Sequence, residues 1–329
     1  MDKDEMDYPR KGEGGSGSLP LADQKIYWKE RNMSNPNRNP KIWLTFFFLG
    51  IGIMGVGNSV QAADFSVIEK ALGVAGQMQE GAYIVRFPRS DLRMTLSSEP
   101  VPTALGFGSW TAWKETGMGM MVMGDIVLLE KEVNPFISAL AEANVSVTAL
   151  HNHFFFEEPR IFFMHIGGMG DAAAMARRIR AALSKTGTPL PPAASPSQPA
   201  PALDTKRLEQ IIGHPGQAGG GVFKITIGRP GVKMGRVELT ASMGLNTWAA
   251  FEGTEERAHV AGDVVMLPRE VNPVIRALRK GGINLTAVHN HMLDEDPRVF
   301  FLHYWGTGPA IKLAETVRAA FDQAKGPVR

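Results

Sequence analysis

The chain has 329 residues, of which 44% are hydrophobic and 21% are charged. This is the composition of a globular protein that is long enough for two ordinary domains. A formal net charge of +2 argues against nucleic acid as a partner, and the absence of cysteine excludes disulfides, thiolate metal ligands and cysteine nucleophiles.

The N-terminal part has the features of an exported protein. The first forty residues are polar and are not expected to bury a core. The apolar run from Ile42 to Val56 follows basic residues, ends near small residues, and is shorter than the roughly 20 residues that a membrane span needs. We predict that residues 1–62 are an N-terminal extension plus a signal peptide, cleaved after Ala62, which gives a periplasmic or secreted protein without a transmembrane segment in the mature chain. An uncleaved anchor is the alternative, and Met33 is an alternative start that would give an ordinary n-region.

The chain contains one sequence twice. Residues 124–168 align with residues 262–306 without a gap at an offset of 138, and 23 of the 45 aligned positions are identical. Upstream, the match continues with a two-residue shift. A Pro/Ala-rich stretch between the copies favours an extended spacer. The sequence therefore predicts two modules, 64–185 and 203–329, joined by a linker at 186–202.

Each module is predicted to combine helices with strands. In the first copy a short helix at 66–72 precedes strands expected at 83–87, 93–96, 108–113 and 125–129. Asn134 and Pro135 have the residue types of an N-cap and a first helical turn. A strand at 145–151, a turn at 157–159, a strand at 160–166 and a helix at 171–183 complete the module. This mixed order predicts an α+β fold, with helices packed on a mostly antiparallel sheet.

Six of the eight histidines lie in the repeated motif; they are His151, His153 and His165 in the first copy and His289, His291 and His303 in the second. Residues two apart on a strand share a face, so each His-Asn-His segment places both rings on one side. The next strand runs back and brings the third histidine opposite them. Three imidazoles on one face are a typical ligand set for zinc, copper or iron, so we predict a divalent metal in each module. The alternative is that the rings hydrogen-bond to backbone carbonyls.

Charged residues follow the histidines in both copies. Glu157 and Glu295 lie four residues beyond the second histidine and are candidates for a carboxylate ligand or a general base. Arg160 and Arg298 are candidates for binding an anionic ligand. Pairing of each arginine with the neighbouring acidic residues is the favoured interpretation.

The two copies also differ. A methionine-rich segment of the first copy contains Met121, and the second copy has His259 at that position. Thioethers beside imidazoles would suit copper(I), but methionine in a strand usually fills the core. Trp110 and Trp248 are expected in the core, with the wall of a pocket as the alternative. The turn after the histidines is more polar in the second copy, which favours that copy for any single active site.

The pattern of His-Asn-His, an acidic pair, Pro-Arg, Phe-Phe and a third His, after Val-Asn-Pro, resembles the LppY/LpqO family of exported bacterial proteins, known from mycobacterial lipoproteins. The resemblance covers both copies and implies an exported or surface-attached protein. It assigns no catalytic residue. Because the chain lacks the cysteine of a lipoprotein, the resemblance implies a soluble periplasmic form.

The sequence leaves three functions open. The favoured hypothesis is an exported metal-binding protein, with metal-dependent enzymatic chemistry such as hydrolysis as one use of the metal. The second is a non-enzymatic module that binds a small-molecule or cell-envelope ligand. The third is a structural role, in which the histidines are buried and hydrogen-bonded.

Overall fold

The structure is a computed structural model that describes residues 64–141, 145–192 and 199–325. These residues belong to one structural unit, Val60–Arg329. The predicted signal peptide and its cleavage after Ala62 lie outside the described residues. No helix within the described ranges combines the length and the apolar character needed to cross a membrane.

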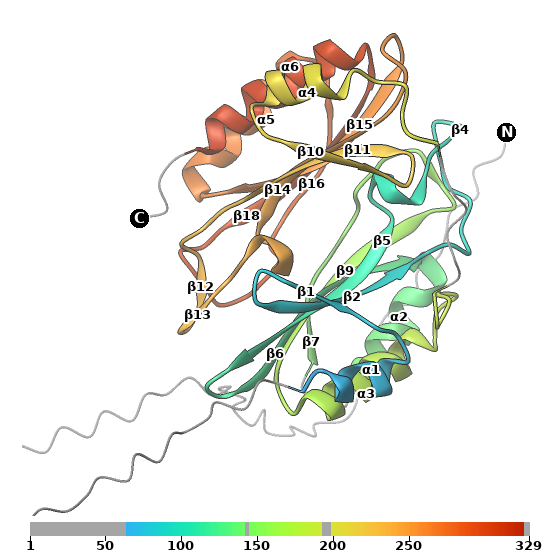
Figure 1. Cartoon of the computed structure of the whole chain (residues 1–329), viewed down its shortest axis with the longest axis vertical. Helices are drawn as coiled ribbons and strands as arrows, with labels where there is room; N and C mark the ends of the chain where they lie inside the picture. Colours follow the sequence, from blue (N-terminus) through green and yellow to red (C-terminus); the bar gives the residue numbers. More distant parts are fainter. Residues whose placement is uncertain (1–63, 142–144, 193–198, 326–329) are drawn as a thin grey trace, which may run out of the picture. The chain divides into compact units, whose positions relative to one another are not determined.

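The first module is built on one antiparallel sheet (Figure 1). Its strands are, in spatial order, β1 (Gln77–Gln79), β2 (Ala82–Pro88), β5 (Gly108–Thr116), β6 (Gly119–Leu129), β9 (Ile161–Gly170) and β7 (Val145–His151). One face is covered by α1 (Ser66–Leu72), α2 (Glu130–Leu140) and α3 (Ala172–Leu183). The helices share an apolar core with Val85, Ile126 and Met164 of the sheet, because alternate strand residues point to this face.

The second module repeats this arrangement. Its strands are, in spatial order, β10 (Gly216–Gly219), β11 (Val222–Gly228), β14 (Asn246–Gly253), β15 (Ala258–Met266), β18 (Phe300–Gly308) and β16 (Asn284–His289). The covering helices are α4 (Thr205–Ile212), α5 (Val271–Lys280) and α6 (Ala310–Phe321). The predicted α+β fold of two tandem modules is confirmed.

Short elements connect the main ones. The short strands are β3 (Thr95–Leu96), β4 (Glu99–Pro100) and β8 (Glu157–Glu158) in the first module, and β12 (Lys233–Met234), β13 (Val237–Glu238) and β17 (Glu295–Asp296) in the second. The 3-10 helices are η1 (Thr103–Leu105), η2 (Ala241–Met243), η3 (Pro268–Glu270) and η4 (Asp322–Ala324). The predicted turn at 157–159 is therefore a short strand paired with β3, and the peptide bond that follows it, Glu158–Pro159, is cis.

The helix that was predicted to open at Asn134 begins earlier. Residue Asn134 lies inside α2, as does Pro135. The backbone N–H of Leu129 donates a hydrogen bond to the Glu132 carboxylate at 2.8 Å, and the buried Arg89 guanidinium lies 2.8 Å from the same carboxylate. These contacts satisfy a free donor at the helix start and fix it there. The assignment of Asn134 as N-cap is wrong, because a tertiary contact outweighs the local capping preference.

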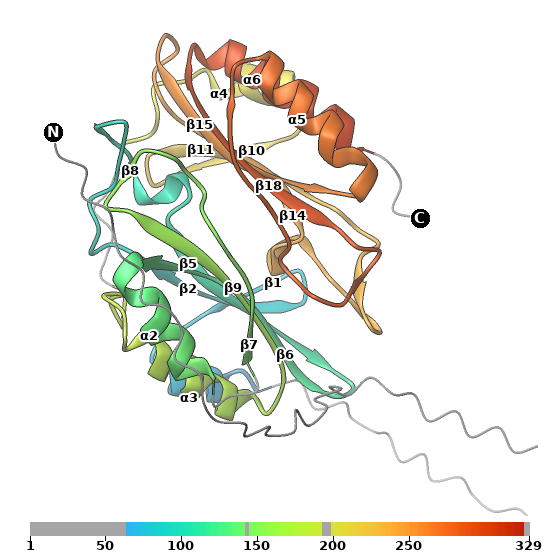
Figure 2. The same ribbon diagram turned by 180° about the vertical axis from the view of Figure 1, so that it is seen from behind.

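The faces of the two sheets that carry no helices pack against each other (Figures 1 and 2). One apolar cluster combines Met121 and Met123 of the first module with Phe301 of the second. Another combines Phe163 of the first with Trp305 of the second. The layers therefore follow the order helices, sheet, sheet, helices, and the interior between the sheets belongs to both modules.

Equivalent residues of the two modules make reciprocal contacts. The hydroxyl of Thr148 donates to the backbone carbonyl of His291 at 2.6 Å, and the hydroxyl of Thr286 donates to the backbone carbonyl of His153 at 2.7 Å. The two threonines are equivalent in the repeat, and so are the two histidines. Such an exchange of partners is the property of an isologous interface, so an approximate twofold axis relates the modules.

Two equivalent glycines permit this close approach. Gly106 has a φ of 153° and Gly244 a φ of 87°. A Cβ atom on Gly244 would lie 2.8 Å from the ring of Trp110, and one on Gly106 would lie 3.4 Å from the ring of Trp248. Each tryptophan thus packs on the glycine of the opposite module, and a side chain at Gly244 would displace Trp110.

Candidate metal centre

The histidines of the repeated motif lie at the approximate twofold axis. His151 and His289 are the last residues of β7 and β16, and His153 and His291 follow two residues later. His165 and His303 lie in β9 and β18, each paired with an alanine two residues before the first histidine. The spacing of two and the returning strand therefore bring the three rings of each module together, as predicted.

The rings of the two modules form one cluster. The closest pairs join the modules, with ring centroids 3.7 Å apart for His151–His289, 3.6 Å for His153–His303 and 3.8 Å for His165–His291. Within the first module the ring of His151 lies 5.1 Å from that of His153 and 4.9 Å from that of His165. The sequence predicted one cluster in each module. A single shared cluster forms because the faces that carry the rings meet at the axis.

Two aspartates border the cluster. Asp125 in β6 pairs in register with His165, and Asp263 in β15 pairs with His303. The Oδ2 atom of Asp263 lies 3.6 Å from Nε2 of His291 and 3.9 Å from Nε2 of His303. Sequence reasoning missed both aspartates. The available signal was an acidic residue, identical in both copies, within an otherwise apolar strand.

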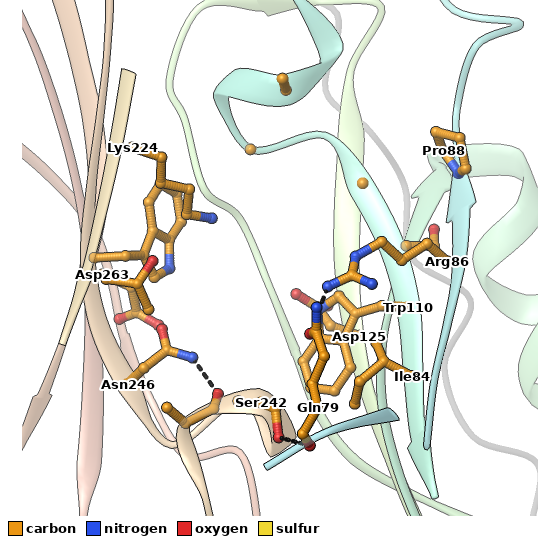
Figure 3. Close-up of a pocket in the computed structure, with 18 of the residues that line it drawn as sticks. Gln79, Ile84, Arg86, Pro88, Trp110, Asp125, Lys224, Ser242, Asn246 and Asp263 are labelled. Atoms are coloured by element: carbon orange, nitrogen blue, oxygen red, sulfur yellow. Dashed lines mark hydrogen bonds between the residues drawn. The ribbon is translucent and has the colours of Figure 1, made fainter. Parts of the chain in front are cut away.

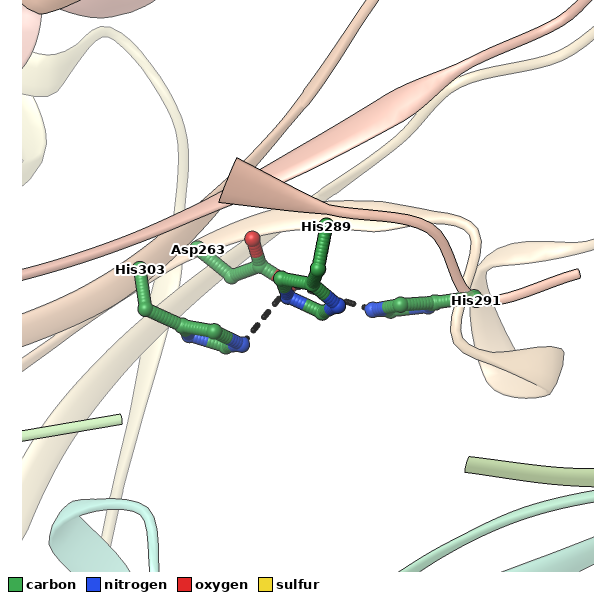
Figure 4. Close-up of side chains that lie close together, drawn as sticks. All are labelled: Asp263, His289, His291 and His303. Atoms are coloured by element: carbon green, nitrogen blue, oxygen red, sulfur yellow. Dashed lines mark ion pairs between the residues drawn. The ribbon is translucent and has the colours of Figure 1, made fainter. Parts of the chain in front are cut away.

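The geometry of this cluster is compatible with a metal ion (Figure 4). Within the described residues, one group of potential ligand atoms lying within 4.8 Å of one another comprises Asp263, His289, His291 and His303. Further groups combine the modules: His151, His153 and His303, and His151, His165 and His289. Tetrahedral zinc with its usual bond lengths places ligand atoms about 3.3 Å apart. The separations from Asp263 exceed this by a few tenths of an ångström, so a small inward movement would suffice. These buried groups could hold a metal ion.

The ring nitrogens have the pattern expected of ligands. In the described structure, the Nε2 atoms of all six motif histidines are buried and have no hydrogen-bond partner. In two of the six rings the other nitrogen has a partner: Nδ1 of His289 contacts the carbonyl of Asn290 at 3.1 Å, and Nδ1 of His303 contacts that of Gly262 at 3.3 Å. In His151 and His153 both ring nitrogens lack a partner within the described residues. An Nδ1–H that donates to a carbonyl leaves the Nε2 lone pair free, which is how most metal-binding histidines are oriented. The structural alternative explains the Nδ1 contacts but not the unpaired Nε2 atoms, since a buried polar group without a partner is costly.

Burial also sets the protonation of the cluster. It lowers the pKa of every motif histidine, to about 4 for His289, and the neighbouring rings lower several of them further. The neutral imidazole is the form that binds metal. Burial raises the pKa of Asp263 to about 8 and that of Asp125 well above its usual range. A cation in the cluster would stabilise both carboxylates.

The remaining charged candidates lie on the short strands and beside them. Glu295 contacts Arg298 at 3.1 Å and accepts a hydrogen bond from the backbone N–H of Val299 at 3.2 Å. Glu157 is buried at the equivalent position, and burial raises its pKa. The guanidinium of Arg160 lies 5.6 Å from the ring centre of Phe162. Within the described residues, neither glutamate belongs to a group of metal-ligating side chains.

The residues that distinguish the copies have other partners. Met121 and Met123 lie in the apolar cluster between the sheets, which is the usual role of methionine in a strand. His259 contacts Glu99 of the first module through Nε2 at 3.0 Å and Thr307 through Nδ1 at 2.8 Å. These contacts give His259 a role in joining the modules.

A cavity of about 820 Å³ lies beside the cluster (Figure 3). Both modules line it, and His153, His291 and His303 form part of its wall together with Asp125 and Asp263. The side chains that could hold a metal ion thus border a space large enough for a small molecule.

Fold and site together define a duplicated α+β protein with one histidine- and aspartate-lined cluster shared by its two modules. The family described as Domain of Unknown Function (DUF1259) matches residues 66–185 and 206–323. The chain belongs to this family, in two tandem copies.

Comparison with other proteins adds little to the family assignment. No match was found among curated proteins. Solved structures that resemble the chain include the trimeric bacterial microcompartment shell protein PduB, with 14% identity over 76% of this chain and 90% of that chain and a TM-score of 0.20. They also include EtuB from Clostridium kluyveri, with 10% identity over 75% of this chain and 89% of that chain and a TM-score of 0.19. TM-scores this low carry no inference about this chain.

Proposed function

We propose that the protein binds a divalent transition metal at the shared cluster of histidines and aspartates. The observation that carries this proposal is the set of buried Nε2 atoms without hydrogen-bond partners, gathered around two carboxylates. Imidazole and carboxylate ligands without thiolates suit zinc, copper(II) or iron(II). Empty, the cluster leaves several buried polar atoms unpaired, each at a cost of about 1–3 kcal/mol, and metal coordination would remove that cost.

Among the described residues, the second module offers the ligand set with the most members. Its three imidazoles, from His289, His291 and His303, would bind the ion, and Asp263 lies close enough to serve as a fourth ligand or to accept a proton from bound water. Three protein ligands plus water is the usual arrangement of a catalytic zinc site, whereas four protein ligands make a structural one. Metal-dependent hydrolysis is therefore one activity that the proposed site would support.

We also propose that the protein is exported. The support is the apolar run of residues 42–56, the small residues around Ala62, and the resemblance of the motif to the LppY/LpqO family. N-terminal sequencing of the protein recovered from a periplasmic fraction tests this proposal. A protein that keeps its N-terminal segment and stays in the cytoplasm would contradict it.

Metal analysis tests the main proposal. Purified protein is treated with chelator, incubated separately with Zn²⁺, Cu²⁺ or Fe²⁺, freed of unbound ions and analysed by mass spectrometry. We expect stoichiometric binding of at least one ion, and loss of binding in the variant His289→Gln/His291→Gln/His303→Gln. The matched control is His214→Gln, which lies outside every group of metal-ligating residues in the described structure. Failure to retain any of the three metals would contradict the proposal.

A binding protein without turnover is the second candidate. The observation that favours it is the cavity of about 820 Å³ beside the cluster, which would hold a small-molecule ligand whether or not the metal acts on it. Hydrolysis of a bound ester by the metal-loaded protein would favour an enzyme over a binding protein, provided that the triple variant lacks this activity.

A further inference from the structure

Two cationic side chains face each other across the cavity (Figure 3). Arg86 of β2 lies on the wall formed by the first module, and Lys224 of β11 lies on the wall formed by the second. Their charged ends point toward one another. A pair of cations on opposite walls attracts a ligand with a negative charge between them.

The duplication does not account for this pair. Arg86 pairs in register with Trp110, and the residue at that position of the second module, opposite Trp248, is Thr226. Conversely, the position of Lys224 is occupied in the first module by an isoleucine. Each module therefore contributes a cation from a different place on its sheet, and both cations reach the same cavity.

In the described structure neither cation is paired with a carboxylate, although Asp125 and Asp263 also line the cavity. A side-chain nitrogen of Arg86 donates to the amide oxygen of Gln79 at 2.9 Å, and Nζ of Lys224 lies 4.0 Å from the centre of the Trp248 ring. Burial lowers the pKa of Lys224 to about 8; Asp263 opposes this change and Arg86 adds to it. The positive charge of Arg86 thus disfavours the charged form of Lys224, and an anion between the two side chains would offset this effect.

The rest of the cavity wall suits an organic ligand. Trp110 and Trp248 are partly exposed there, and each is held in place against a glycine of the opposite module. Fixed aromatic surfaces bind apolar or planar groups at a low cost in conformational entropy. The hydroxyl of Ser242 and the amide of Asn246 add polar contacts to the wall.

We propose that this cavity binds an organic anion, with its phosphate or carboxylate group between Arg86 and Lys224 and its body against Trp110 and Trp248. The ligand would lie beside the histidine cluster, and an organic anion would then be the substrate class of the metal site. This last step rests on the proposed function. This cavity places the anion at residues other than Arg160 and Arg298, the candidates taken from the sequence; the guanidinium of Arg298 pairs with Glu295. Charge-assisted hydrogen bonds from a guanidinium and an ammonium are the strongest contacts that such a head group makes.

Calorimetric titration with three small probes tests the inference. Phenyl phosphate and phenylacetate carry the two head groups on one aromatic body, and benzyl alcohol is their neutral counterpart. Each is titrated into chelator-treated and into zinc-loaded protein. We expect both forms to bind at least one anionic probe more tightly than benzyl alcohol, and the tighter of the two anions identifies the head group.

Variants with a matched change of charge supply the decisive comparison. Arg86→Gln and Lys224→Gln are each expected to weaken anion binding by about tenfold to a hundredfold, the equivalent of one charge-assisted hydrogen bond. Arg207→Gln and Lys206→Gln, on the exposed side of α4, remove the same charges elsewhere and are expected to leave it unchanged. Arg86→Lys keeps the charge and is expected to retain most of the affinity, which separates a lost contact from a fault in folding.

The possible outcomes separate this inference from the metal proposal. Equal affinities in the cavity and control variants would overturn the inference, as would benzyl alcohol binding as tightly as both anions. Metal content is measured on the same samples. Wild-type protein that retains metal but binds neither anion contradicts the inference alone. Protein that binds the anions through Arg86 and Lys224 but retains no metal supports the cavity assignment and contradicts the proposed metal function.

Discussion

Substitution of Gly244 by alanine tests the packing of the two modules, on which the shared cluster depends. The new Cβ atom would lie 2.8 Å from the ring of Trp110, closer than carbon atoms approach in proteins, and 3.6 Å from Nδ1 of His291. The φ of Gly244 is 87°, so alanine is also strained there. Gly282→Ala is a matched control, because Gly282 has a similar φ of 80° but a Cβ atom there would meet nothing within 4 Å.

The expected magnitudes follow from these two effects. A left-handed backbone costs a residue other than glycine about 1–2 kcal/mol, and this cost applies to both variants. Forcing a methyl group against a packed ring adds about 1–3 kcal/mol at Gly244 alone. We therefore expect Gly244→Ala to lower the free energy of unfolding by about 2–5 kcal/mol and Gly282→Ala by about 1–2 kcal/mol.

Unfolding in urea, monitored by tryptophan fluorescence, measures the difference in the free energy of unfolding between each variant and the wild type, provided that the slopes of the unfolding curves agree. The double variant Gly244→Ala/Trp110→Leu isolates the contact, because a smaller side chain at position 110 leaves room for the methyl group. We expect Gly244→Ala to cost less in that background than in the wild type. Gly244→Ala and Gly282→Ala could lower the free energy of unfolding equally, and Gly244→Ala could cost the same with leucine at position 110. That result would refute the packing of Trp110 on Gly244 and remove the basis for a shared histidine cluster.

Three further predictions concern the cluster itself. Burial lowers the pKa of the motif histidines below 6.5, to about 4 for His289, so the unfolded chain binds more protons between these values. The stability of metal-free protein should therefore fall as the pH falls from 6.5 to 4, by up to about 1.4 kcal/mol per pH unit for each histidine. The raised pKa values of Asp125 and Asp263 have the opposite effect on stability, but two aspartates oppose six histidines. Equal urea midpoints at pH 7 and pH 5 would contradict the argument. Zinc at about a thousand times its Kd should add about 4 kcal/mol to the free energy of unfolding, and chelator should reverse the gain, as thermal unfolding would show. Asp263→Asn should weaken metal binding by at least about tenfold, as loss of a ligand or of its partner does, while Asp296→Asn at an exposed position should not.

Local patterns predicted most of the main elements of the fold and the six histidines of the candidate site. The helix at 66–72 and the strand at 145–151 agree with α1 and β7 residue for residue, because their apolar spacing and flanking residues are local properties. The spacing of His151 and His153 likewise predicted rings on one face. Each of these features depends on a few consecutive residues.

The features that were missed depend on contacts between distant residues. α2 begins before Asn134 because Arg89, far away in the sequence, binds Glu132. The shared cluster forms only because the faces of both sheets meet. The hydrophobic periodicity within one module does not predict this contact between modules. Asp125 and Asp263 join the site through register across the sheet rather than through proximity in the sequence.

The approximate twofold axis through the histidine cluster has a consequence for how the cavity came to be asymmetric. A single module could assemble the same cluster only as a homodimer, in which every side chain occurs twice and every substitution changes both walls at once. Fusion into one polypeptide lifts that constraint, so a guanidinium can arise on one wall and an ammonium at a different place on the other. Because the two modules are covalently linked, a protein with an approximately symmetric framework can bind an asymmetric ligand that is charged at one end.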